Sequence, residues 1–477
     1  MARSSEKRNG LSRRELLAKS AKSAVVLALG SQFVGCPKQG SDVPQVIPES
    51  AKGANERIGV GIIGCGRRNG QLMMGKGGQG KPPKEAHIVA VADVNLKRAK
   101  QWGEKYNCPS FQDYRKLLEL KEVDVVIYAT PEHSHYLPCI HACQAGKDIY
   151  GEQPLSHTIR EGQVMIQAVR KYKRIFQVGE QQRSHPATRK AVELILNGRI
   201  GKVHTVIGFN YPSPWDAEFA AEQVPADLDW DHWCGQNEVI PFNTNIYLSR
   251  IPYNRENYPA EPAEKAAIGP GWMSLRPSSG GELVNWGCHG LSMVLWGLGM
   301  DDSGPVEIWV EPAKKLDKLV YTQPEDRKRG DELMSQGIIH YRFPNDVVLK
   351  LEGTDERLGG GGTFIGEKGK ITIFRGGYEC DPPELDKEPL PANAVRVYES
   401  DNHMENFFEC VKTRKDPITP VEVAHRIATL CHLGNIARWL GRPLKWDPEK
   451  EIFPGDDEAN QYLDCPKRKG FELPEEV

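Results

Sequence analysis

The hydrophobic positions of the chain fall into short apolar runs that alternate with amphipathic segments. Residues 57–63 form one such run and residues 123–129 another, the second nearly without polar interruption. A continuous apolar run suits a strand that is covered on both faces, as in a parallel sheet. The alternation continues through runs at 87–92, 148–150 and 176–179 and a helix at 158–172. We therefore predict a doubly wound α/β domain with a parallel sheet over residues 57–182.

After residue 183 the pattern changes to strand-like segments with few helices between them. These segments lie at 202–211, 306–311, 337–343, 347–352 and 371–374. We predict that residues 183–415 form a second domain of α+β type built on a further sheet. Residues 416–477 should form a C-terminal helix and an extended tail. The helix is expected to begin at the capping box Thr419-Pro420-Val421-Glu422 and to end before Gly441.

The N-terminus has the features of an export signal. A basic segment contains Arg13 and Arg14 and precedes a short, weakly apolar run, which is typical of a twin-arginine signal. We expect residues 1–35 to be removed and residues 36–56 to form a flexible linker. Cys36 lies in a sequence similar to a lipobox, so the exported protein would be periplasmic or anchored by a lipid on Cys36. No run reaches the roughly 20 apolar residues of a membrane span.

Charge and cysteine content narrow the possible functions. The 62 Lys and Arg and 64 Asp and Glu of the 477 residues give a net charge of −2, which lacks the basic surface of a nucleic-acid-binding protein. None of the 11 cysteines forms a CxxC pair. Cys139 and Cys143 are one helical turn apart while His141 points elsewhere, so we interpret them as buried helical residues and predict no metal site.

A glycine-rich turn follows the first predicted strand. Such a turn places backbone amides and a helix N-terminus against a pyrophosphate. The third glycine of the usual GxGxxG pattern is replaced by Asn69. The residues expected at the dinucleotide are Gly64, Cys65, Gly66, Arg67 and Arg68.

Asp93 ends the second strand, where a carboxylate would hold the ribose diol of a dinucleotide. A carboxylate repels a 2′-phosphate, which favours NAD over NADP. Arg67 and Arg68 weaken this preference, since either guanidinium can neutralise a phosphate. The sequence therefore indicates a nucleotide site with NAD as the expected cofactor.

Several ordered motifs resemble the Gfo/Idh/MocA oxidoreductases, which include glucose–fructose oxidoreductase and inositol dehydrogenase. The motifs are ATPEHSH at 129–135, GEQPL at 151–155, VGEQQRS at 178–184, GGELVNWGCHG at 280–290 and HMENFFECVKTRKDP at 403–417. The resemblance runs from about residue 57 to the C-terminus. It implies a Rossmann domain followed by a domain with a large open, mostly antiparallel sheet, which covers the cofactor and often mediates homo-oligomers.

The resemblance also implies roles for individual residues. Segments that line the nicotinamide half of the cofactor site contain Thr130, Pro131, Glu152 and Pro154, and His135 matches a family histidine that is more simply explained as packed. Gln181 and Arg183 match positions near the substrate cleft.

Two departures from the family pattern concern catalysis. The family lysine of Glu-Lys-Pro is Gln153, and the DxxxHxxD helix contains Asn285, His289 and Ser292 instead. Gln and Asn hydrogen-bond but do not carry protons. A histidine suits general acid–base chemistry near neutral pH, so we expect His289 to be the proton-transfer residue.

These observations predict an exported NAD-dependent enzyme that acts on a sugar, glycoside or polyol by hydride transfer at a secondary alcohol, with the cofactor tightly bound. Two alternatives stay open. Transient oxidation can drive elimination or epimerisation, giving a lyase, glycosidase or epimerase. The changed catalytic residues also fit a sugar-binding or scaffold protein. Aromatic residues between 212 and 280 can stack on sugars or simply pack; they are Trp215, Trp230, Trp233 and Trp272.

Overall fold

The computed structural model describes residues 57–78, 80–248, 270–316, 320–474 and 477. The predicted export signal, Cys36 and the linker lie outside the described residues. Within the described part of the chain, no helix is long and apolar enough to cross a membrane.

The N-terminal sheet confirms the predicted doubly wound architecture. Six strands pair in the order β3-β2-β1-β4-β5-β6, and all pairs are parallel. This is the strand order of a Rossmann fold. The strands are β1 (Ile58–Ile63), β2 (Ala86–Ala92), β3 (Ser110–Phe111), β4 (Val125–Tyr128), β5 (Asp148–Gly151) and β6 (Phe176–Val178). Every residue of β1 and β4 is buried, which explains their continuous apolar sequence.

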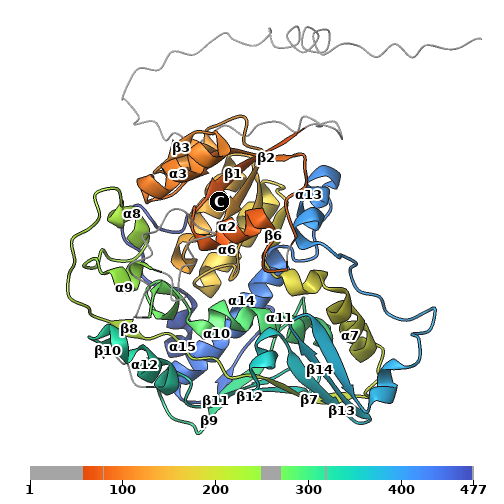
Figure 1. The fold of residues 1–477 in the computed structure, drawn as a ribbon. Helices are drawn as coiled ribbons and strands as arrows, with labels where there is room; N and C mark the ends of the chain where they lie inside the picture. Colours follow the sequence, from red (N-terminus) through yellow and green to blue (C-terminus); the bar gives the residue numbers. More distant parts are fainter. Residues whose placement is uncertain (1–56, 79, 249–269, 317–319, 475–476) are drawn as a thin grey trace, which may run out of the picture. The chain divides into compact units, whose positions relative to one another are not determined.

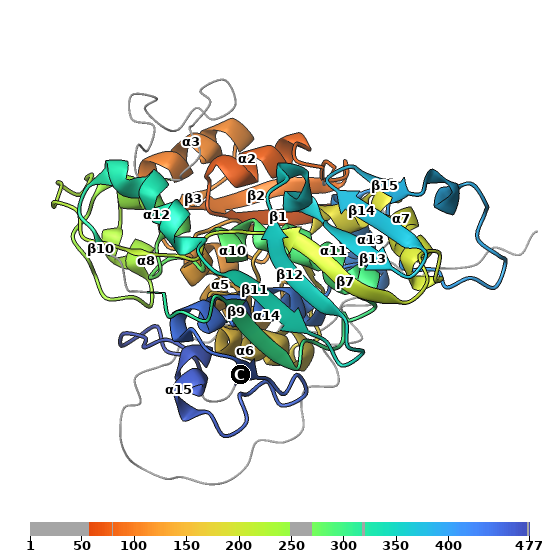
Figure 2. The same cartoon turned by 90° about the horizontal axis from the view of Figure 1, so that it is seen from below.

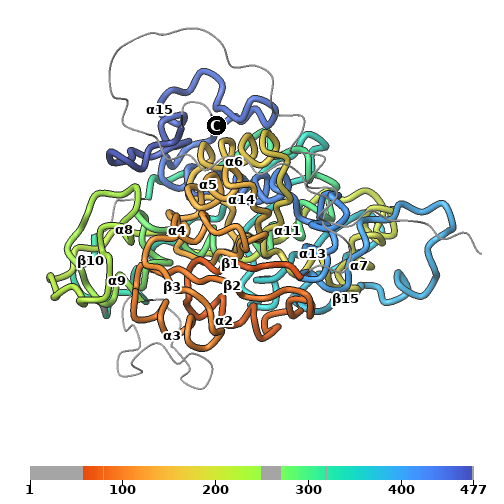
Figure 3. The backbone as a smooth tube through the Cα atoms, turned by 90° about the horizontal axis from the view of Figure 1, so that it is seen from above, coloured from red at the N-terminus to blue at the C-terminus, as the bar shows by residue number. Residues whose placement is uncertain are grey.

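Helices cover both faces of this sheet (Figure 3). One face carries α2 (Arg67–Met74) and α3 (Leu96–Tyr106), and the other carries α4 (Tyr114–Leu118), α5 (Tyr136–Gln144) and α6 (Ile159–Lys171). The predicted start of α6 is confirmed, because the Thr158 side chain accepts a hydrogen bond from the Glu161 amide. Cys139 and Cys143 are buried in α5, as expected.

The C-terminal sheet has eight strands in the order β15-β14-β13-β7-β12-β11-β9-β16. It is mostly antiparallel, as the resemblance implied, and only β7 and β12 pair in parallel. Figure 2 views this sheet from its outer side. The strands are β7 (Val203–Phe209), β9 (Glu307–Glu311), β11 (Ile338–Arg342), β12 (Val348–Gly353), β13 (Gly362–Gly366), β14 (Gly369–Phe374), β15 (Gly377–Asp381) and β16 (Leu444–Lys445).

Helices fill the space between the two sheets (Figure 1). They are α10 (Glu282–Asn285), α11 (Gly287–Leu298) and α14 (Val421–Leu440), while α7 (Pro186–Leu196) packs at the β14–β15 end. Helix α14 contacts both α6 and β9, so it joins the cores of the two domains. The remaining short elements are β8 (Asp216–Ala217), α8 (Trp230–Cys234), α9 (Thr244–Tyr247), β10 (Val320–Tyr321), α12 (Arg327–Met334), α13 (His403–Thr413) and α15 (Asp457–Asn460).

Three expectations about the C-terminal part differ from the structure. Helix α14 begins at Val421 and not at a Thr419 capping box, because the Thr419 hydroxyl donates to the Val178 carbonyl of β6 at 2.9 Å. Helix α13 buries Phe407 and Phe408 in the core of the N-terminal domain, so the end of the 183–415 segment packs with that domain. The tail is not extended, since it forms β16 and α15 and packs on the second core.

Candidate active site

A cavity of about 620 Å³ lies at the carboxyl ends of the parallel strands and extends to α10, α11 and the segment around α8. Ligands bind at this edge in open α/β sheets. The cavity brings together most of the predicted site residues. From the first domain they are Gly64, Gly66, Arg67, Arg68, Asp93, Thr130, Pro131, Glu152, Gln153 and Gln181, and from the second Asn285 and His289.

The glycine turn is shaped to bring backbone amides to the cavity. Gly64 has φ +83°, and a Cβ atom there would lie 2.6 Å from the Ala129 carbonyl oxygen, so only glycine fits without strain. A Cβ on Gly66 would meet no atom within 4 Å, which leaves space for a ligand. Asn69 takes the place of the third glycine and is buried, and its amide donates to the Ile63 and Gly64 carbonyls at 3.0 and 2.7 Å.

Asp93 joins the glycine turn to the start of α3. Its carboxylate accepts from the Cys65 and Asn95 backbone amides, both at 2.8 Å. The Arg98 guanidinium lies 3.3 Å from Asp93 Oδ2 and also lines the cavity. The sequence analysis did not predict Arg98 as a cavity residue. Its position in the first turn of the helix that follows Asp93 could have indicated it. The position expected for a ribose diol therefore holds a carboxylate beside a guanidinium.

Three of the predicted cofactor-binding residues do not line the cavity but support the segments around it. They are Cys65, His135 and Pro154. The Cys65 side chain is buried, and only its amide reaches Asp93. The His135 ring lies within hydrogen-bond distance of the Pro154 and Thr130 carbonyls, at 2.8 and 3.0 Å. Burial lowers the pKa of His135 to about 4. We conclude that a neutral His135 holds together the segments of Thr130 and Pro154, which is the packed role considered above.

Arg183 is placed differently from the expectation that it lies near the substrate. It is buried, and its guanidinium binds both Asp301 carboxylate oxygens at 2.7 Å. It also donates to the Ser292 hydroxyl and carbonyl, at 2.9 and 3.0 Å. These contacts turn Arg183 toward α11 and away from the cavity, so it is a structural tie. Gln181, two residues earlier, does line the cavity.

Two buried acceptor atoms of the neighbouring residues Glu152 and Gln153 lack a partner within the described residues. Arg68 forms an ion pair with Glu152 Oε2 at 2.7 Å. The other carboxylate oxygen of Glu152 and the amide oxygen of Gln153 are buried without a hydrogen bond. Buried acceptors are normally satisfied. These two oxygens, next to the cavity, fit a bound group that brings N–H or O–H donors, as a dinucleotide does.

His289 has a carboxylate partner that the sequence analysis missed. His289 Nδ1 lies 3.1 Å from Oε2 of Glu180, and both side chains are buried. Glu180 precedes Gln181 in the VGEQQRS motif, but its partner is 109 residues away in the sequence. A carboxylate acceptor at Nδ1 fixes the imidazole orientation and directs its lone pair to Nε2. No described residue hydrogen-bonds to Nε2, and His289 lines the cavity.

A second missed carboxylate, Glu132, holds Asn285. Glu132 is fully buried and accepts from the Asn285 side-chain amide at 3.0 Å and from the Gly280 backbone amide at 2.8 Å. Burial raises the pKa of Glu132 to about 7. Because the Asn285 nitrogen is engaged with Glu132, its oxygen is the atom left to accept a hydrogen bond in the cavity.

The predicted tryptophans divide into two groups. Trp233 and Trp272 line the cavity, whereas Trp215 and Trp230 do not. All four pack in or against one hydrophobic cluster. The indole rings of Trp230 and Trp233 stack at 4.4 Å. Trp286, which had not been singled out, also lines the cavity and is 39% exposed, with its ring centroid 6.0 Å from that of His289.

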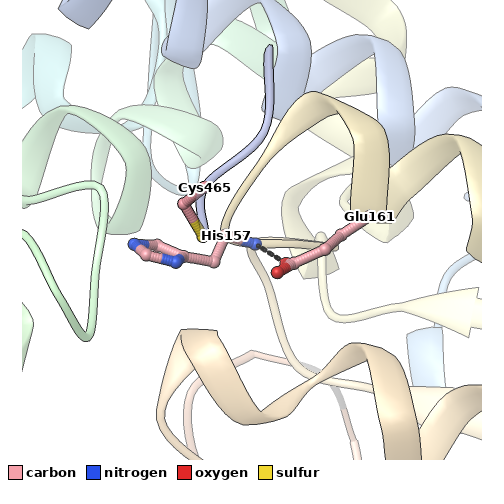
Figure 4. A group of neighbouring side chains, drawn as sticks. All are labelled: His157, Glu161 and Cys465. Atoms are coloured by element: carbon pink, nitrogen blue, oxygen red, sulfur yellow. Dashed lines mark hydrogen bonds between the residues drawn. The ribbon is translucent and has the colours of Figure 1, made fainter. Parts of the chain in front are cut away.

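Outside the cavity, His157, Glu161 and Cys465 bring potential metal ligands within 4.8 Å of one another (Figure 4). The only hydrogen bond drawn among them runs from the His157 backbone amide to Glu161, at 3.0 Å. The Lys467 ammonium lies 3.5 Å from Glu161 and 3.9 Å from the Cys465 sulfur. Since the chain's own cation lies against these ligands, we interpret the cluster as an anchor for the C-terminal tail.

Comparison with known proteins supports the resemblance noted above. Residues 58–180 match the profile "Oxidoreductase family, NAD-binding Rossmann fold", and residues 275–473 match the C-terminal α/β domain of the same family. Inositol 2-dehydrogenase of Salmonella typhimurium is 28% identical over 186 residues, covering 37% of this chain and 52% of that protein. Levoglucosan dehydrogenase of Pseudarthrobacter phenanthrenivorans is 31% identical over 129 residues, covering 27% and 33%. The chain thus matches about half or less of the length of these relatives.

Solved structures show the same fold. Aldose–aldose oxidoreductase from Caulobacter crescentus, complexed with glycerol, has a TM-score of 0.53 at 17% identity and covers 82% of this chain and all of its own. Levoglucosan dehydrogenase with NADH and levoglucosan has a TM-score of 0.52 at 18% identity, covering 82% and 99%. These likenesses show the fold, and the two profile matches, which together span most of the chain, show that it belongs to the Gfo/Idh/MocA family of oxidoreductases.

Proposed function

We propose that this protein is an NAD-dependent oxidoreductase that oxidises a secondary alcohol of a sugar, glycoside or polyol. The observation that carries the proposal is the buried Glu180–His289 pair, which opens into the same cavity as the glycine turn and Asp93. A proton acceptor and a dinucleotide cradle in one cavity are the two requirements of alcohol oxidation.

The residues present fit the dinucleotide. The amides around Gly66 and the N-terminus of α2 would hold its pyrophosphate, Asp93 its adenosine ribose, and the unpartnered acceptors of Glu152 and Gln153 its nicotinamide end. When bound, NAD supplies the acceptor for the hydride that leaves the alcohol carbon. NAD is preferred to NADP because Asp93 opposes a 2′-phosphate, while Arg98 beside it reduces that preference.

The protein's own residues manage the hydroxyl proton. With Nδ1–H donated to Glu180, His289 takes the proton at Nε2, and the carboxylate stabilises the imidazolium that forms. The Asn285 side-chain nitrogen donates to Glu132, and the oxygen of the amide oriented in this way accepts a hydrogen bond from a substrate hydroxyl. Gln153 stands where the family has lysine and orients without transferring a proton. The exposed Trp286 ring provides an apolar face for the C–H surface of a sugar beside His289.

The proposal is tested with His289→Ala and Glu180→Gln. A positioned base contributes about 10²–10⁴-fold to the rate, so kcat of His289→Ala should fall by that order with NAD still bound. Glu180→Gln should lower kcat less than His289→Ala does, because the imidazolium loses its counter-charge but the base remains. Glu193→Gln, a buried carboxylate that pairs with Arg396 outside the cavity, is the matched control. Full activity of His289→Ala would contradict the mechanism.

We further propose that the protein is exported folded, with its cofactor already bound. The support is the Arg13-Arg14 pair joined to a nucleotide-binding fold, since twin-arginine export carries folded proteins. Replacing both arginines by lysine should retain the protein in the cytoplasm, and fractionation would detect this. Unchanged export would refute the idea.

The net reaction is decided by product analysis. Because free dinucleotide is expected to be scarce outside the cytoplasm, the reduced cofactor would be reoxidised within one cycle, by a second substrate or by the same one. Release of an oxidised sugar with a reduced partner fits an oxidoreductase, whereas a cleaved or epimerised sugar would fit the lyase or epimerase alternative. A protein whose bound cofactor is reduced by no sugar would instead be a binding protein.

A further inference from the structure

Arg375 is a cavity residue whose purpose the proposed function does not explain. It follows β14 in the turn to β15 and lines the same cavity as His289 and Trp286. Gly360 makes room for it, because a Cβ at Gly360 would lie 2.9 Å from the Arg375 Cβ and 3.0 Å from Oε1 of Gln182. The Gln182 amide in turn donates to the His289 carbonyl at 3.5 Å. The β14–β15 turn therefore brings a guanidinium to the neighbourhood of the proposed catalytic histidine.

The Arg375 guanidinium has no directly bonded partner in the described part of the protein. Within the described residues, Arg375 makes no hydrogen bond and no ion pair. Two other arginines of the cavity are paired, Arg68 with Glu152 and Arg98 with Asp93. The carboxylate that acts on Arg375 is that of Glu180, which is already engaged with His289. Arg375 is exposed to solvent, and partial desolvation by the surrounding protein lowers its pKa.

We propose that the substrate is an acidic sugar whose carboxylate binds Arg375 while its secondary alcohol lies at His289. This inference rests on the proposed function and narrows its substrate class. The planar guanidinium matches a carboxylate in a two-point contact. The cofactor's pyrophosphate is a weaker candidate, because Gly66 and the N-terminus of α2 already provide its site.

The experiment compares acidic sugars with their neutral counterparts on NAD-loaded protein. The pairs are methyl glucuronide with methyl glucoside, galacturonate with galactose, and gluconate with sorbitol, and glucose 6-phosphate serves as a phosphate probe. Wild type should prefer the acid of at least one pair by tenfold or more in kcat/KM. Arg375→Gln should reduce that preference by about 10–100-fold through KM, Arg375→Lys should keep part of it, and the Kd for NAD should not change.

The matched control is Arg357→Gln, which removes the same charge from an exposed arginine paired with Asp355 and Glu379. Equal use of both members of every pair by wild type would overturn the proposal. So would a higher Kd for NAD in Arg375→Gln, which would assign the residue to the cofactor, or a stronger preference for the phosphate probe. If no sugar reduces NAD, the proposed function fails, and ligand-observed NMR of the same pairs on the loaded protein still decides whether Arg375 selects carboxylates.

Discussion

Two buried carboxylates determine what the polar side chains of the cavity can do. The family lysine and aspartate are replaced by Gln153 and Asn285, which cannot transfer protons. Glu180 compensates by pairing with His289, and Glu132 fixes the amide of Asn285. In the mechanism we propose, one histidine therefore transfers the proton, and its neighbours orient the substrate.

Glu132 makes the stability of the protein depend on pH. Burial raises its pKa from 4.5 to about 7, so the folded state binds its proton more tightly than the unfolded state does. The contribution of Glu132 to the free energy of unfolding is therefore fully present below pH 4.5 and is lost as the pH rises to about 7. Glu132→Gln should gain stability relative to wild type between pH 4 and pH 8, by about 3 kcal/mol. Urea unfolding at each pH measures this, with the exposed Glu104→Gln as control; a difference that does not vary with pH would contradict it.

Asp93 should control both the affinity and the selectivity for the cofactor. Loss of a buried hydrogen-bonding carboxylate in Asp93→Ala should weaken NAD binding by about 1–3 kcal/mol and reduce discrimination against NADP. Fluorescence titration with both cofactors measures the effect. Because Asp93 also holds the Cys65 amide, Asp93→Asn is needed as a variant of equal size. Equal weakening for NAD and NADP would show that Asp93 only supports the turn.

At the scale of elements, single buried side chains join segments that are distant in the sequence. Arg183 links the segment after β6 to the end of α11 through Asp301 and Ser292. Arg183→Met should lower the free energy of unfolding by about 2–3 kcal/mol, since charged hydrogen bonds are lost, while KM of the folded enzyme stays the same. Arg189→Met, which breaks pairs with the exposed Glu399 and Asp401, should cost only about 0–1 kcal/mol. If Arg183→Met raised KM without lowering the free energy of unfolding, Arg183 would be a substrate-binding residue and not a structural one.

At the scale of the molecule, the cavity lies where the two domains meet, so a bound dinucleotide would contact both. Ligands that bind only the folded state stabilise it by mass action. Purified protein should carry near-stoichiometric NAD(H) through dialysis and turn over substrate with none added, and stripping the cofactor should lower Tm. Mass spectrometry and thermal scans test this. Recovery of empty protein that works only with millimolar free NAD would favour an ordinary dehydrogenase.

The sequence alone predicted five of the six strands of the N-terminal sheet and its glycine turn, and it missed the two-residue strand β3. Strands β1 and β4 are buried on both faces, and their sequences are therefore continuous apolar runs that can be recognised without the structure. Gly64 provides the positive φ of the turn, and Asp93 accepts hydrogen bonds from nearby backbone amides, so both roles can be inferred from the local sequence. Strands β13 and β15 were missed, because glycines and exposed positions interrupt their patterns.

Only the tertiary structure decided how the polar side chains of the cavity pair. Glu180 meets His289 across 109 residues and Glu132 meets Asn285 across 153, and no local pattern records such separations. The same holds for Arg183, whose direction depends on Asp301, and for Arg375, which reaches the cavity only because the second sheet folds over it. The sequence gives the type of each residue, whereas the fold determines which charged residues lie next to one another, and these neighbours decide the chemistry of each side chain.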